Sequence, residues 1–63
     1  MIQFIASGFD ALGRRVVLWR KGDYHYEVET MLGLAAGSRK VTLACSYEEA
    51  VEDFEAHIGL ETA

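Results

Sequence analysis

The chain has 63 residues, of which 51% are hydrophobic, 25% charged and 11% aromatic, and its ten acidic and six basic side chains give a net charge of −4. This length predicts a single domain over residues 1–63 and excludes a multi-domain enzyme, a doubly wound nucleotide-binding fold and a barrel with a deep pocket. The one cysteine, Cys45, excludes an internal disulfide; we expect a reducing, cytoplasmic environment and a buried thiol. The chain has neither a secretion-signal pattern nor the roughly 18 apolar residues that cross a bilayer, so no membrane association is expected.

Residues 1–6 alternate, with Ile2, Phe4 and Ala6 on one side, and this pattern indicates a first short strand. Residues 14–21 and 24–31 follow, both rich in β-branched and aromatic side chains and separated only by Gly22 and Asp23. Glycine at the first position of a two-residue loop is typical of a type II′ turn, so the two runs are predicted to form a β-hairpin.

A two-residue loop fixes which side chains of this hairpin lie opposite each other. It pairs Trp19 with Tyr26 and Val17 with Val28, and these four side chains are predicted to face the core. The other side of the hairpin is predicted to be a mixed charged and apolar surface, and a second candidate site for a partner or a second copy. Its members are Val16, Leu18, Arg20, His25, Glu27 and Glu29.

Residues 33–38 are predicted to form a loop or a short helical turn. Residues 39–45 alternate again, which predicts a strand with Val41, Leu43 and Cys45 facing inward.

A C-terminal helix is the strongest local prediction. Ser46 followed by Glu49 matches a capping box, in which Ser46 accepts from the Glu49 amide and Glu49 reaches back to the Ser46 amide. Gly59 is placed to end the helix in a left-handed cap. The apolar residues that follow Ser46 recur at helical spacing, which predicts that they share one face of the helix: Tyr47, Ala50, Val51, Phe54 and Ile58.

These elements predict an α+β domain, with an antiparallel sheet of three or four strands and one C-terminal helix packed on one face. Four helix residues, Ala50, Val51, Phe54 and Ile58, are expected to meet the inward side of the sheet. The sheet residues expected there are Trp19, Tyr26, Val17, Val28, Val41 and Leu43.

Charge is divided unevenly along the chain. Residues 1–46 carry all six basic side chains and four acids, a net charge of +2, whereas residues 47–63 carry six acids and no Lys or Arg, a net charge of −6. Like charges four residues apart destabilise a helix. This arrangement indicates either a solvated face that keeps a small protein soluble or a surface that binds a basic partner, and we call it the acidic helix face. At helical spacing this face, opposite Phe54, comprises Glu48, Glu49, Glu52, Asp53 and Glu55.

No motif of a catalytic, cofactor-binding or metal-binding site is recognisable, such as a nucleophile elbow, an HExxH pair or a CxxC pair. His25, Glu27 and Glu29 share one side of a strand, where neighbouring side chains are about 6.5–7 Å apart, too far for three to converge on one ion. His57 is expected to have a structural role near the helix end. Since the net charge is negative, direct nucleic-acid binding is disfavoured as well.

Two segments carry a resemblance to a known family. Residues 24–29, Tyr-His-Tyr-Glu-Val-Glu, resemble the second strand of the N-terminal domain of HicB-type antitoxins, and residues 46–51, Ser-Tyr-Glu-Glu-Ala-Val, resemble its helix-opening S/T-x-E-E-A signature. The resemblance implies a domain that masks a small basic toxin. This chain has no proline after the second strand and no match to a DNA-binding domain, so operator binding is not implied.

In character, as a small, acidic, single-domain and cofactor-free chain, the protein is also similar to phage-encoded anti-CRISPR proteins. That similarity implies inhibition by binding a basic, nucleic-acid-handling protein, with the acidic helix face imitating phosphates. We therefore expect a non-enzymatic inhibitor of this kind. Two alternatives stay open: the antitoxin-like domain, and a homodimeric interaction module that uses the sheet surface with Val16 and Leu18.

Overall fold

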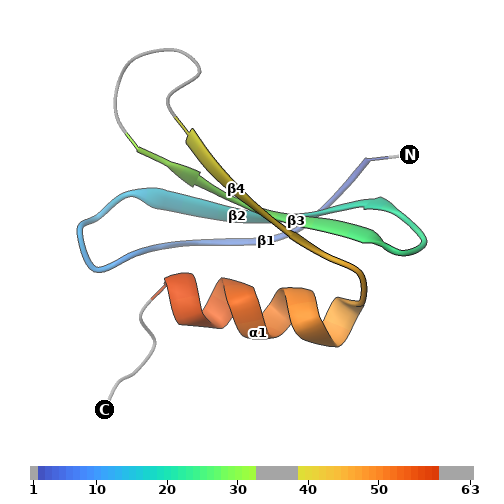
Figure 1. The fold of residues 1–63 in the computed structure, drawn as a ribbon. Helices are drawn as coiled ribbons and strands as arrows, with labels where there is room; N and C mark the ends of the chain where they lie inside the picture. The colour runs from blue at the N-terminus through green and yellow to red at the C-terminus, as the bar shows by residue number, and fades with distance from the viewer. Residues whose placement is uncertain (1, 33–38, 59–63) are drawn as a thin grey trace.

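The structure is a computed structural model that describes residues 2–32 and 39–58. It contains four β-strands followed by one α-helix (Figure 1). The predictions for residues 33–38 and for Gly59 fall outside the described residues. In chain order the elements are β1 (Gln3–Phe9), β2 (Arg15–Gly22), β3 (His25–Met31), β4 (Arg39–Ala44) and α1 (Tyr47–His57).

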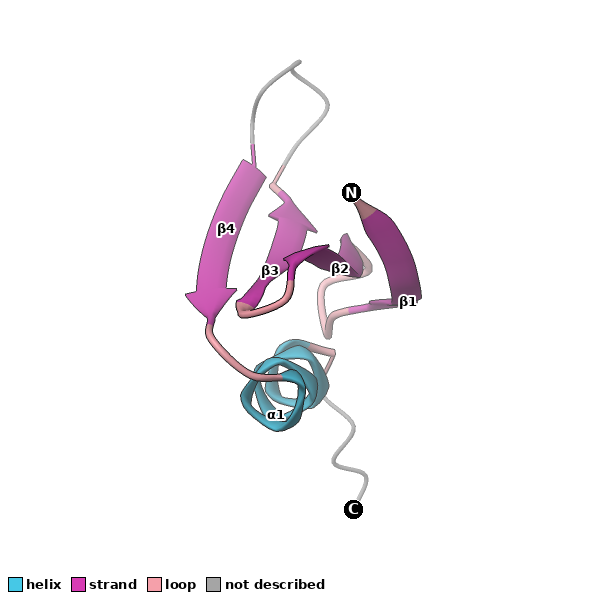
Figure 2. Ribbon diagram, turned by 90° about the vertical axis from the view of Figure 1, so that its right-hand side faces the viewer, coloured by secondary structure: helices cyan, strands magenta, loops and turns pink. Residues whose placement is uncertain are grey.

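The four strands form one sheet in the order β1-β2-β3-β4, with every neighbouring pair antiparallel. The helix α1 lies against one face of this sheet (Figure 2). The predicted α+β class with a single C-terminal helix is therefore confirmed, and of the three or four strands predicted the sheet has four. The first strand covers Gln3–Phe9, which extends beyond the predicted residues 1–6.

The register of the β2–β3 hairpin differs from the prediction by one residue. A β-bulge between Arg20 and Gly22 inserts Lys21 as an extra residue, so that Trp19 lies opposite Glu27 and Leu18 opposite Val28. Because side chains alternate along a strand, a one-residue shift moves every side chain of β2 to the other face of the sheet. The expected pairs of Trp19 with Tyr26 and of Val17 with Val28 are wrong for this reason.

The core lies between the sheet and α1 and contains the opposite set of β2 side chains. Val16 and Leu18 are fully buried there with Val28 and Tyr26, whereas Trp19 and Val17 point to the other side of the sheet. Tyr26 and Val28 were predicted correctly. The rest of the core cluster comes from the end of β4 and from α1: Ala44, Ala50 and Phe54, with Val51 and Ile58 packed against them.

Strand β4 also presents the face opposite to the one predicted. Val41 and Leu43 are exposed, whereas Ala44 is buried beneath the helix. Cys45 is exposed too, which overturns the expectation of a buried thiol. The register explains the reversal, because Val41 and Leu43 lie opposite Glu29 and Glu27, which point away from α1.

The N-terminus of α1 has the predicted Ser46 cap, but the second hydrogen bond of the predicted capping box has a different donor. Ser46 Oγ accepts from the Glu49 amide at 3.2 Å, while the Glu49 carboxylate accepts from the amide of Cys45, at 3.3 Å, rather than from Ser46. At the other end, Ile58 lies over Gly8 of β1, where an added Cβ would come within 3.2 Å of its side chain. Gly8 thus lets the end of α1 approach the edge of the sheet.

Candidate functional site

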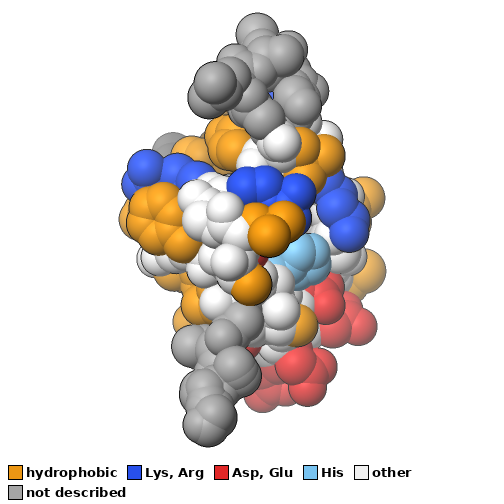
Figure 3. All heavy atoms as spheres, turned by 90° about the vertical axis from the view of Figure 1, so that its left-hand side faces the viewer, with side chains coloured by type: hydrophobic (Ala, Val, Ile, Leu, Met, Phe, Trp, Pro, Cys, Tyr) orange, Lys and Arg blue, Asp and Glu red, His pale blue; other side chains and the backbone are white. Residues whose placement is uncertain are grey.

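The acidic helix face is formed by α1, whose buried residues are Ala50 and Phe54. Four of its five carboxylate residues are exposed and Asp53 is half-buried. Among residues 2–32 and 39–58, no ion pair involves any of these five. Figure 3 shows the acidic side chains gathered on one side of the molecule, apart from the Lys and Arg side chains above them. The predicted cluster is therefore brought together on one accessible surface.

The four acids of the sheet region are arranged in the opposite way, because each forms an ion pair with a base in the same region. Two of these pairs belong to turns. Asp10 contacts Arg14 at 2.8 Å in the β1–β2 turn, and Asp23 contacts Arg20 at 3.0 Å in the β2–β3 turn.

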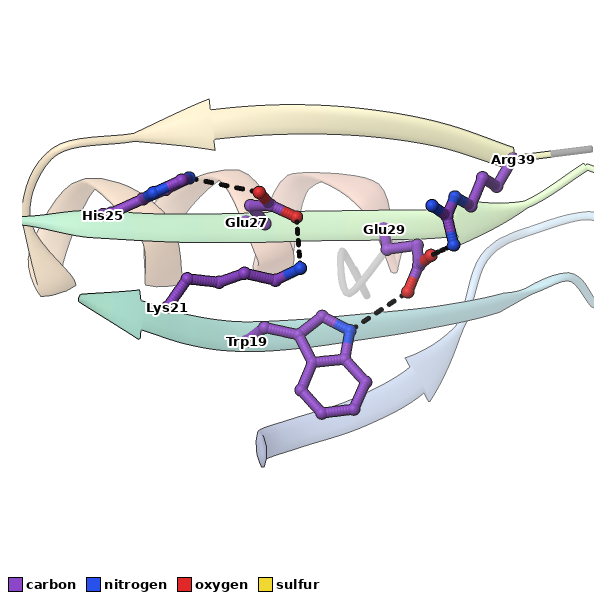
Figure 4. Close-up of polar contacts among 6 residues, drawn as sticks. All are labelled: Trp19, Lys21, His25, Glu27, Glu29 and Arg39. Carbon is purple, nitrogen blue, oxygen red and sulfur yellow. Dashed lines mark hydrogen bonds and ion pairs between the residues drawn. The ribbon is translucent and has the colours of Figure 1, made fainter. Parts of the chain in front are cut away.

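The other two acids, Glu27 and Glu29, lie on the face of the sheet that points away from α1 (Figure 4). Glu27 contacts Lys21 at 3.2 Å and His25 at 3.1 Å. Glu29 contacts Arg39 at 2.9 Å and accepts a hydrogen bond from the indole Nε1 of Trp19 at 3.0 Å. These carboxylates therefore serve to hold three strands together.

The second candidate surface does not exist as it was predicted. Val16 and Leu18 are buried beneath α1 and are unavailable to a partner, whereas His25, Glu27 and Glu29 lie on the opposite side of the sheet. His25 and Glu27 do touch, but Glu27 is shared with Lys21, a cation that opposes a metal ion. Within the described ranges no three potential ligands are grouped to hold a metal.

The surface that replaces it is the open face of the sheet, which sequence reasoning missed. It is defined by the strand residues that point away from α1. Phe4 packs edge-on against Trp19 with ring centroids 5.9 Å apart, and the Arg15 guanidinium lies 5.9 Å from the centre of the Phe9 ring. The members of the open face are Phe4, Ser7, Phe9, Arg15, Val17, Trp19, Lys21, His25, Glu27, Glu29, Met31, Arg39, Val41 and Leu43.

A pocket of about 290 Å³ lies where the β1–β2 turn meets the last turn of α1, and its lining includes Asp10, Thr30 and His57. The Asp10 carboxylate is occupied, because it accepts from the backbone N–H groups of Arg14 and Leu12 and from the Arg14 side chain. These hydrogen bonds, led by that of the Arg14 amide, lower the pKa of Asp10 below its ordinary value. His57 Nδ1 donates to the Asp53 carbonyl oxygen at 2.7 Å, which agrees with a structural role.

Comparison with known proteins gives no relative for this chain: no family model, no curated protein and no solved structure matches it. In the part of the chain that the structure describes, no helix has the length and apolar character needed to cross a membrane.

Proposed function

We propose that this protein is a non-enzymatic inhibitor that binds a basic, nucleic-acid-handling protein through the acidic helix face. The observation that carries the proposal is the contrast in charge pairing. Every acid of the sheet region has a basic partner, while the five acids of α1 have none among the residues described. A row of carboxylates of this kind is complementary to a channel that normally receives phosphates.

The energetics of α1 support this proposal. Glu48 with Glu52 and Glu49 with Asp53 are like-charge pairs four residues apart, and each pair destabilises the helix by a few tenths of a kcal/mol. Glu55 lies in the second half of the helix, where the dipole favours cations. The helix therefore keeps a charge pattern that lowers its own stability, as expected when the pattern is used for binding.

Two classes of target protein are compatible with this proposal. By character the protein is similar to anti-CRISPR inhibitors of phage origin, and by its strand and helix motifs to HicB-type antitoxins. Both resemblances imply a basic partner, so the same acidic face would serve either. The partner itself decides between them: a large nucleic-acid-binding assembly favours the first, and a small basic toxin favours the second.

The test is affinity capture from a bacterial lysate on the immobilised protein, in parallel with two variants of equal charge. E48Q/E52Q/E55Q removes three helix carboxylates and changes the net charge from −4 to −1. The matched control, I2K/L12K/Y24K, reaches the same −1 by adding cations at three exposed positions outside the helix. We expect the wild type and the control to retain a basic protein that the helix variant loses.

The capture experiment is repeated with increasing salt and with added nucleic acid. Because carboxylates attract their partner electrostatically, the captured protein should elute with rising salt, and added RNA or DNA should displace it if the helix occupies its phosphate-binding site. Equal retention by the helix variant and the wild type would contradict the proposal. So would equal loss from the control and the helix variant, because net charge alone would then explain binding.

A further inference from the structure

The open face carries large apolar side chains along its two edge strands and a closed polar network between them. On β1, Phe4 and Phe9 are 55% and 61% exposed, and on β4 Leu43 is 65% exposed. Between these edges the side chains of Glu27 and Glu29 are only 17% and 11% exposed, and each is already bound to a base of its own chain. Covering the middle of this face would therefore bury apolar surface without breaking an ion pair or leaving either carboxylate without a partner.

The strand register makes the face complementary to itself. One row across the sheet reads Phe4, Trp19, Glu27, Leu43, from β1 to β4. If two open faces stack with a two-fold axis parallel to the strands, β1 of each copy lies over β4 of the other. Phe4 of one copy then meets Leu43 of the second copy at both edges of the contact. We propose that the open face binds a second copy of this chain in this arrangement.

The charge distribution favours a second copy on this face. The acidic helix face lies on the other side of the sheet, so stacking two open faces leaves both helices on the outside of the dimer (Figure 2). Stacked sheets are about 10 Å apart, and the helices lie beyond them, so their charges are separated by more than the Debye length of about 8 Å. Both acidic faces stay free in the dimer, and the inference therefore does not depend on the proposed function.

The area of the open face indicates how strongly two copies can associate. Four strands about 4.8 Å apart and about 23 Å long give a flat area of about 440 Å² per copy. A two-copy contact on the order of 900 Å² lies below the roughly 1,200 Å² at which stable complexes begin. The dimer is therefore weak, and we expect it to form at micromolar to millimolar rather than nanomolar concentration.

The first test is sedimentation equilibrium from about 10 μM to about 1 mM. The wild-type mass should rise from the 7.0 kDa of the monomer toward twice that value. L43K should move the midpoint at least about tenfold higher, because it places a cation in the apolar contact. L12K is the matched control, since Leu12 is a similarly exposed leucine in the β1–β2 turn, and it should leave the midpoint unchanged.

A second variant tests the arrangement itself. F4E should weaken the dimer as L43K does, while F4E/L43K should restore it, because the introduced carboxylate of each copy then meets the introduced ammonium group of the other. The two positions lie on opposite edge strands of one chain, so they do not pair within a monomer. Circular dichroism confirms that each variant is folded, and F4E replaces L43K should the latter fail to fold. A mass of 7.0 kDa at every concentration, an equal effect of L12K, or no rescue by the double variant would overturn the proposal.

Discussion

The sheet region and the helix contain similar numbers of carboxylates but use them differently. The four acids before residue 33 each contact a base of the same chain, and two of them, Glu27 and Glu29, are largely buried in doing so. Four of the five acids of α1 are exposed, and within the described ranges none of the five forms an ion pair. The comparison separates carboxylates that hold the fold together from carboxylates that are available for binding.

The largest expected effect comes from removing one acid from each region and comparing the stabilities of the two variants. Glu29→Ala leaves the Trp19 indole and the Arg39 guanidinium without their acceptor, so we expect a loss of about 1–3 kcal/mol in the free energy of unfolding. Glu52→Ala removes an exposed, repelled charge, and we expect a change within about 0.5 kcal/mol. Urea unfolding followed by circular dichroism measures both values. Equal losses would mean that the two groups of carboxylates do not differ in their structural role.

This difference also explains which parts of the molecule could be predicted from sequence. The helix and its acidic face depend on a capping box and a 3.6-residue period, both contained within one short segment. No tertiary contact is needed to place Glu48, Glu52 and Glu55 on the side opposite Phe54. The position of the acidic cluster could therefore be predicted, as could the order of strands and helix.

The open face could not be predicted because it depends on pairing between strands. The bulge at Lys21 is one extra residue, yet it reverses the direction of every side chain in β2. Trp19 is the residue type expected in a core, and it lies on the open face, where Glu29 accepts its N–H. The partner that neutralises Glu29 is Arg39, ten positions away in another strand, and local sequence does not identify such a pair.

A smaller effect is expected from one substitution in α1 that should raise the stability of the fold and lower its affinity for a basic partner. Glu52→Lys places a cation four residues after Glu48, three after Glu49 and three before Glu55, so three repulsions in α1 become attractions. We expect the variant to gain about 0.5 kcal/mol in the free energy of unfolding while losing affinity for a basic partner. Thermal unfolding and the lysate capture measure the two quantities on the same preparation. A variant that loses stability would show that Glu52 has a structural partner after all.

The smallest effect concerns Asp10, whose contribution to stability depends on pH. Hydrogen bonds from the backbone N–H groups of Arg14 and Leu12, with the Arg14 side chain, hold its pKa below the ordinary value of 3.8. A lowered pKa means that the folded state favours the carboxylate. This contribution to stability is complete above pH 3.8 and is lost as the pH falls below that value toward the folded-state pKa.

Replacing Asp10 with Asn removes the titrating group while keeping an oxygen that can accept from the turn amides. We therefore expect D10N to have a lower Tm than the wild type at neutral pH, and the gap to narrow as the pH falls below 3.8. Melting curves of the two proteins between about pH 7 and pH 2.5 measure this gap. All other titrating groups are common to both proteins, so their effects cancel in the difference. A difference in Tm that stays constant into acid would contradict this prediction. It would show that the negative charge of Asp10 does not stabilise the turn.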